Sequence, residues 1–125
     1  MNSKTFFAHD TDEQIIQTKR LQDLQTWISH LSYVTNECDW LAKIASNKIR
    51  DRVLRDELLE KIEANSALLN EFYNYKSTIQ SFQECDDLDC DLFYINQHDV
   101  YHDKYVKHIN AYRQVKNKVY LKLLD

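Results

Sequence analysis

The stretch LQDLQTWISHLSYVTNECDWLAKIASNKI, residues 21–49, decides the fold of this chain. Apolar or small side chains recur in it at alternating intervals of three and four residues, which is the pattern of one helix face. The spacing never slips, so it predicts one long helix over about residues 11–50. We call such a row of core-facing positions along one helix a seam. The first seam consists of Leu21, Leu24, Ile28, Leu31, Thr35, Cys38, Ala42, Ala45 and Ile49, with Trp27, Val34 and Leu41 beside it.

The chain as a whole contains neither glycine nor proline among its 125 residues. Glycine supplies the positive φ angles of tight turns and proline fixes turns, so a sheet protein rarely lacks both. Their absence predicts an all-α protein with few connections. It also excludes glycine-rich phosphate loops, dinucleotide fingerprints and GxSxG elbows, all of which need glycine. The sequence carries no catalytic motif, and we expect a protein that is not an enzyme.

A second helix is indicated by a seam that does not continue the phase of the first. The phase break predicts a turn between about Arg50 and Asp56, with Asp56 as N-cap and a helix over about residues 56–84. A continuous helix with a stutter, or a turn at Ala64–Ser66, are the alternatives. The second seam consists of Leu58, Ile62, Asn65, Leu69, Phe72, Lys76 and Ile79.

An acidic connection, residues 84–91, precedes a third helix over about residues 91–124. Three such helices predict a single domain over residues 1–125, an elongated up-down-up antiparallel three-helix bundle. A break of the first helix near Asn36 would give a four-helix bundle instead. The apolar and aromatic stripe of the third helix is Ile95, His98, His102, Tyr105, Ile109, Tyr112, Lys116, Val119 and Leu123.

Charge is expected to separate between the two ends of this bundle. Residues 77–103 contain seven acids and neither lysine nor arginine. Acids at helix N-termini and bases at C-termini complement the helix dipole, which explains part of the pattern. A basic end could also hold an acidic or phosphate-bearing partner, or the acidic end of a second copy in a salt-sensitive contact. The residues of the predicted basic end are Lys48, Arg50, Arg52, Arg55, Lys116, Lys118 and Lys122.

A metal site at the acidic end is the second functional hypothesis. His98 and His102 are four residues apart and project from one helix face, and the fold would bring Cys85, Cys90 and His9 within reach. Imidazoles with thiolates suit zinc or another divalent transition metal. The alternative is that both histidines are half-buried members of the third seam.

The leading hypothesis is a non-enzymatic module for protein–protein interaction or self-association. Tyrosine is enriched at interfaces, although it also serves as a core residue with a polar tip. The net charge of −4 argues against nucleic-acid binding, and no apolar run is long enough for a membrane span. Three cysteines without an export signal predict reduced thiols in a cytoplasm. The candidate interface residues are Tyr94, Tyr101, Tyr105, Tyr112 and Tyr73.

Overall fold

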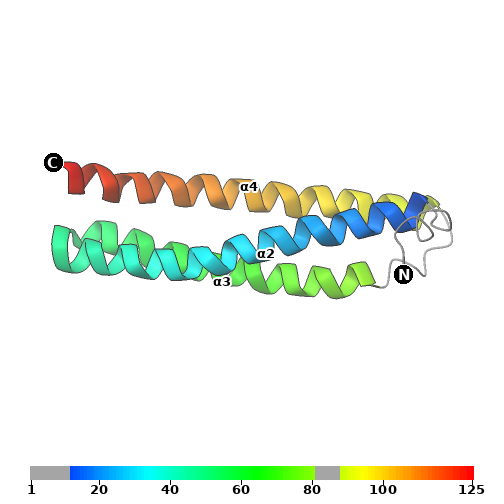
Figure 1. The fold of residues 1–125 in the computed structure, drawn as a ribbon, viewed down its shortest axis with the longest axis horizontal. Helices are drawn as coiled ribbons and strands as arrows, with labels where there is room; N and C mark the ends of the chain where they lie inside the picture. Colours follow the sequence, from blue (N-terminus) through cyan, green and yellow to red (C-terminus); the bar gives the residue numbers. More distant parts are fainter. Residues whose placement is uncertain (1–11, 81–87) are drawn as a thin grey trace, which may run out of the picture.

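The computed structural model of the chain describes residues 12–80 and 88–125. Within these ranges the elements are α2 (Asp12–Ile44), the π-helical segment η1 (Ala45–Ile49), α3 (Arg52–Gln80) and α4 (Leu88–Leu124). Figure 1 shows them as an elongated antiparallel bundle, with the end of α4 beside the turn between η1 and α3. The all-α three-helix prediction is confirmed. Helix α2 runs through Asn36 without a break, so the four-helix alternative does not form.

The core lies along the seam of α2, which packs most closely against α3. Leu24, Leu31 and Leu58 are fully buried, and each contributes about 1.5–3 kcal/mol relative to an exposed position. Cys38 is buried on the same seam, where its thiol donates to the Leu58 carbonyl at 3.2 Å. Burial raises the pKa of this thiol to about 11, so the protein holds it as an unreactive core residue.

Helix α4 departs from its predicted stripe at both ends. Ile109 in the middle is buried, whereas Ile95, His102 and Leu123 are exposed. The predicted row of residues spaced by seven, Ile95, His102, Ile109 and Leu123, lies at the margin of the buried face, and only Ile109 reaches the core. The buried face of α4 instead continues through Tyr101, His108 and Val115, which are at least half-buried.

The turn between α2 and α3 lies at Arg50 and Asp51, at the start of the predicted interval. Ala45–Ile49 widens into a π-helical turn, and Arg50 takes a left-handed conformation with φ 60°. Its successor Asp51 caps α3, because the Asp51 Oδ1 atom accepts a hydrogen bond from the Leu54 N–H at 3.0 Å. The predicted N-cap at Asp56 is therefore wrong, and α3 begins at Arg52. The predicted end of this helix at residue 84 lies outside the described residues.

Helix α4 buries Ile109, Tyr112, Val115 and Val119 in the shared core, and hydrogen bonds between polar side chains also join it to α2 and α3. It lies less close to α2 than α3 does, so histidine and tyrosine side chains bridge the distance. At the centre, the His108 Nε2 atom lies 2.9 Å from the Oδ1 atom of the buried Asn65. The Asn65 amide nitrogen in turn donates to the Leu31 carbonyl and the Thr35 hydroxyl. The polar seam position thus connects all three helices.

Candidate functional site

His98, the central residue of the predicted metal site, already uses both of its ring nitrogens. The Tyr75 hydroxyl donates to Nδ1 at 2.6 Å, and Nε2 lies 3.3 Å from the Asp23 carboxylate. The ring also stacks on Trp27, with centroids 5.0 Å apart. Burial lowers the pKa of His98 although Asp23 opposes this shift, so the neutral ring is favoured. A metal at His98 would have to displace one of these two partners.

The other predicted metal ligands are not gathered around His98 by the described part of the chain. His102 is exposed, and its Nδ1 atom lies 3.8 Å from Asp103. His9 and Cys85 lie outside the described residues, and so does the side chain of Cys90. Across residues 12–80 and 88–125, no group of three or more histidine, cysteine or acidic side chains is placed to hold a metal ion. The metal site remains a prediction.

Three of the five candidate interface tyrosines pack into the bundle. Tyr112 is 2% exposed, Tyr101 stacks on Tyr75 with centroids 4.5 Å apart, and Tyr105 stacks on Trp27. Little of their surface is left for a partner. Tyr73 is half-exposed on α3, and the side chain of Tyr94 is outside the described part.

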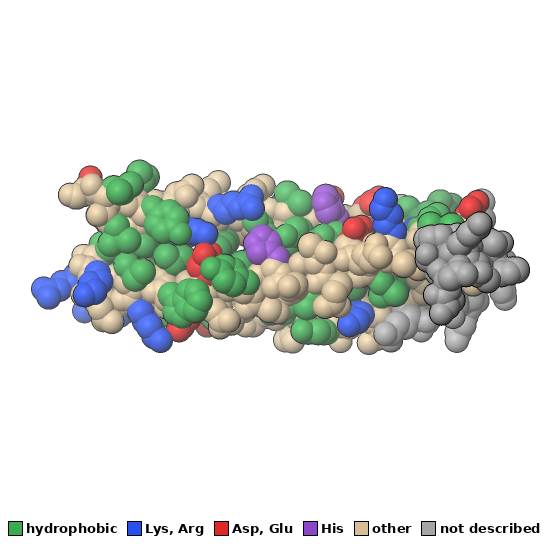
Figure 2. Space-filling view, in the orientation of Figure 1, with side chains coloured by type: hydrophobic (Ala, Val, Ile, Leu, Met, Phe, Trp, Pro, Cys, Tyr) green, Lys and Arg blue, Asp and Glu red, His purple; other side chains and the backbone are tan. Residues whose placement is uncertain are grey.

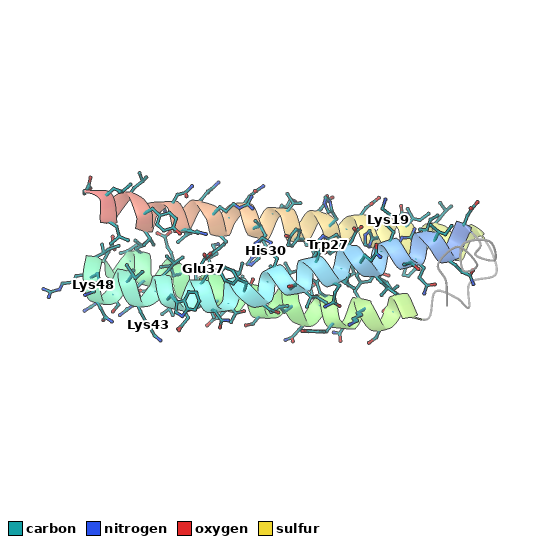
Figure 3. The ribbon with its side chains drawn as sticks, in the orientation of Figure 1. Lys19, Trp27, His30, Glu37, Lys43 and Lys48 are labelled. Carbon is teal, nitrogen blue, oxygen red and sulfur yellow. The ribbon has the colours of Figure 1, made fainter. Side chains whose placement is uncertain are left out.

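The predicted basic residues do gather at the end that holds the η1–α3 turn, but several are neutralised within the fold. Lys118 pairs with Glu57, Lys122 with Asp51, Arg55 with Asp56 and Lys116 with Glu37. Three of the seven predicted basic-end residues, Lys48, Arg50 and Arg52, have no ion-pair partner among the described residues. Figure 3 shows Lys48 projecting from this end of the molecule.

An exposed aromatic cluster lies beside this basic end, on the surface shared by α2 and α4. Tyr33 and Trp40 are 53% and 52% exposed, and their rings meet edge to face with centroids 6.3 Å apart. Tyr120 of α4, 43% exposed, lies near the Lys116 ammonium group, which is 5.7 Å from its ring centroid. We call Tyr33, Trp40 and Tyr120 the outer aromatic surface. Figure 2 shows hydrophobic side chains gathered on this part of the face, with Lys and Arg side chains at the tip.

A half-buried ion pair holds the two halves of this surface together. The Glu37 carboxylate accepts hydrogen bonds from the Tyr112 hydroxyl and from Lys116 Nζ, the latter at 2.9 Å. Burial alone would raise the pKa of Glu37, but the hydrogen bonds from Tyr112, Lys116 and Tyr33 lower it. Glu37 therefore stays ionised and fixes the spacing of α2 and α4 beneath the aromatic rings. Figure 3 shows Glu37 on the side of α2 that faces α4.

Helix α2 carries further exposed apolar side chains toward its N-terminus. Toward the acidic end it carries Ile15 and Ile16, both 44% exposed, and on α4 Ile95 is 38% exposed. No helix in residues 12–80 or 88–124 combines the length and apolar character needed to cross a bilayer. Large exposed apolar side chains therefore occur toward both ends of α2.

Tyr33 and Trp40 were not among the predicted site residues because neither falls on the seam of α2. Their spacing of seven residues places both on the outward side of a helix whose opposite side is already apolar. Two large aromatic residues at that spacing, on a face that the seam does not need, were the signal that could have identified the surface.

Comparison of the chain with models of known protein families, with curated protein sequences and with solved structures finds no match.

Proposed function

We propose that this protein is a non-enzymatic self-association module that pairs with a second copy, antiparallel, through the outer face of α2 and α4. The observation that carries the proposal is the outer aromatic surface, where Tyr33, Trp40 and Tyr120 are each about half-exposed. Tryptophan and tyrosine at interfaces contribute a large share of the binding free energy. Side chains of these residues that stay exposed to water gain no stabilisation from burial of their apolar surface.

Charge complementarity supports a second copy as the partner. Antiparallel pairing lays the basic end of each copy over the acidic end of the other. Lys48, Arg50 and Arg52 supply positive charge at one end, and among the described residues Asp12, Asp99 and Asp103 supply negative charge toward the other. The same pairing would set the aromatic patch of each copy against the aliphatic patch around Ile15 and Ile16. Under two-fold symmetry, the contact between the aromatic patch of one copy and the aliphatic patch of the other occurs twice in the same interface.

The available area also suits a dimer. Residues 12–49 form one helical rod about 57 Å long at 1.5 Å per residue. A strip of that length and one to two helix diameters wide covers about 600–1,100 Å² on each copy. Stable interfaces bury about 800 Å² per partner.

The proposal is tested by substituting the aromatic residues and measuring molar mass by light scattering after size-exclusion chromatography. Trp40→Ala should weaken dimerisation at least tenfold, as expected for an interface hot spot. Tyr33→Ser should weaken it as well. The matched control is Tyr73→Ser, because Tyr73 is 51% exposed on α3, outside the proposed interface.

Equal dimer affinity for Trp40→Ala and the wild type would contradict the proposal. Loss of the dimer with Tyr73→Ser alone would place the interface on α3 instead. Recovery of a stoichiometric unrelated protein by the monomeric wild type would assign the aromatic surface to a different partner. Circular dichroism melts of each variant would show whether the bundle itself is intact.

A further inference from the structure

A small polar hollow lies at the end of the bundle, where the chain passes from η1 into α3. Its lining residues are Ser46 of η1, Arg50 of the turn, and Arg52 and Arg55 of the first turns of α3. The hollow has a volume of about 160 Å³, and its lining is mainly polar. Three arginine residues therefore border one space.

The acids near this hollow neutralise only part of its charge. Arg55 donates to the Asp56 carboxylate through Nε and Nη2, at 3.1 and 2.9 Å. Asp51 accepts from Lys122 and caps the Leu54 N–H, so its carboxylate is already used. Lys122 and the capped amide hold the pKa of Asp51 below its usual value.

Arg50 and Arg52 thus remain as two guanidinium groups without an ion-pair partner in residues 12–80 and 88–125. Arginine presents a planar fork of donors that matches the oxygens of phosphate and carboxylate groups.

The placement of these cations also opposes the usual preference at a helix start. The first turn of α3 contains no acidic residue, although negative charge is favoured there. Arg52 instead stands at the positive end of the helix dipole, beside Arg55. Asp51 caps this helix start and Asp56 pairs with Arg55, so a further anion would act mainly by relieving the repulsion among Arg50, Arg52 and Arg55.

We propose that this hollow binds a phosphate group, as the free ion or as a monoester, between Arg50, Arg52, Arg55 and the Ser46 hydroxyl. A tetrahedral dianion offers enough oxygens for three guanidinium groups at once, whereas a carboxylate offers two. Sites for organic ligands usually measure about 300–1,000 Å³, so a hollow of about 160 Å³ suits one oxyanion group. Arg50 and Arg52 also supply positive charge in the proposed dimer, so the molar mass of each variant is measured by light scattering to distinguish loss of the dimer from loss of phosphate binding.

The test is a titration of the wild-type protein with inorganic phosphate and, separately, with O-phosphoserine. Binding is followed by thermal melting and isothermal calorimetry at constant ionic strength, balanced with NaCl. Either probe should raise the melting temperature by several degrees at tens of millimolar. The double variant Arg50→Asn/Arg52→Gln should bind at least tenfold more weakly, because it removes both unpaired guanidinium groups. Lys107→Gln, which removes an exposed cation from the middle of α4, is the matched control and should bind as the wild type does.

The two probes distinguish the source of the phosphate group. Tighter binding of O-phosphoserine would assign the site to a monoester, and tighter binding of inorganic phosphate would assign it to the free ion. The proposal is overturned if neither probe binds, if NaCl at equal ionic strength gives the same rise in melting temperature, or if Arg50→Asn/Arg52→Gln binds as tightly as Lys107→Gln. A thermal melt of the double variant without phosphate separates lost binding from lost folding, because a cooperative transition shows that the bundle is formed.

Discussion

The Nε2 atom of His108 lies 2.9 Å from the Oδ1 atom of Asn65, and this contact joins α4 to α3 at the centre of the bundle. Asn65 is fully buried, and its amide nitrogen also reaches the Leu31 carbonyl at 2.7 Å. An apolar residue at this seam position would pack equally well in many registers, whereas the amide fits its partners in one. The pair is therefore expected to set the register of α4 against α3.

Replacing Asn65 by alanine should destabilise the protein by about 2–3 kcal/mol, because it leaves His108 without its partner and opens a cavity. The measurement is urea unfolding followed by circular dichroism. The double variant Asn65→Leu/His108→Leu removes both polar groups and should recover at least half of this loss. A loss below about 0.5 kcal/mol for Asn65→Ala would show that the contact contributes little.

Acidification should destabilise the bundle below about pH 6.5. Burial lowers the pKa of His30, His98 and His108, so the folded protein binds fewer protons than the unfolded chain in this range. Stability is then fully present above the unfolded pKa of about 6.5 and is lost as the pH falls toward the lower folded values. Protonation of His30 would also remove the acceptor of the Tyr105 hydroxyl, which lies 2.5 Å from Nδ1.

The pH dependence is checked by thermal melts between pH 7.5 and 5.5. His98→Gln should flatten the decline, because it removes one of the three buried imidazoles. His102→Gln removes an exposed imidazole and serves as the matched control. A melting temperature that stays constant or rises over this interval would contradict the assignment of neutral histidines to the interior.

The half-buried ion pair of Glu37 and Lys116 should contribute more to the free energy of unfolding than the exposed pair of Glu71 and Lys104. The side chains of the first pair are 15% and 25% exposed, and those of the second are 42% and 47% exposed. Glu37→Ala leaves the Tyr112 hydroxyl and Lys116 without their acceptor and should lose about 2–3 kcal/mol. Glu71→Ala should lose less than about 1 kcal/mol. Equal losses in urea unfolding would show that Glu37 does not organise the joint between α2 and α4.

Arg50→Gly should stabilise the protein by about 0.5–1 kcal/mol. Arg50 has a φ of 60°, a conformation that glycine adopts without the steric penalty of a Cβ atom. Arg50→Ala removes the same charge and keeps the Cβ atom, so it separates the conformational gain from the electrostatic one. A melting temperature that rises as much for alanine as for glycine would assign the effect to charge alone.

The arrangement of the helices could be predicted from the sequence because it depends on local periodicity. Leu24, Leu31 and Cys38 repeat every seven residues, and all three are fully buried. The N-cap at Asp51 could not be recognised, because a left-handed arginine takes the place where glycine usually ends a helix. The exposure of Ile95 and Leu123 could not be predicted, because a seven-residue repeat does not specify whether the row of Ile109 or the neighbouring row of His108 faces the core.

The candidate sites were less accessible from sequence because their partners are distant along the chain. His98 was expected to bind a metal, yet its neighbours Tyr75 and Asp23 come from two other helices. The outer aromatic surface could not be predicted from the sequence either, although two of its residues are close together along the chain. Tyr33 and Trp40 are near in sequence, but only the packing of α4 shows that Tyr120 joins them and that none of the three is needed by the core.

The most direct test of self-association is sedimentation equilibrium of the wild-type protein at low and high salt. At low salt and micromolar concentration, the account predicts a particle of about twice the 15.0 kDa chain mass. Raising the salt to about 1 M shortens the Debye length to about 3 Å and should shift this particle toward the monomer, because the opposite ends of two copies attract one another. A particle of 15.0 kDa at every salt and protein concentration would contradict the account.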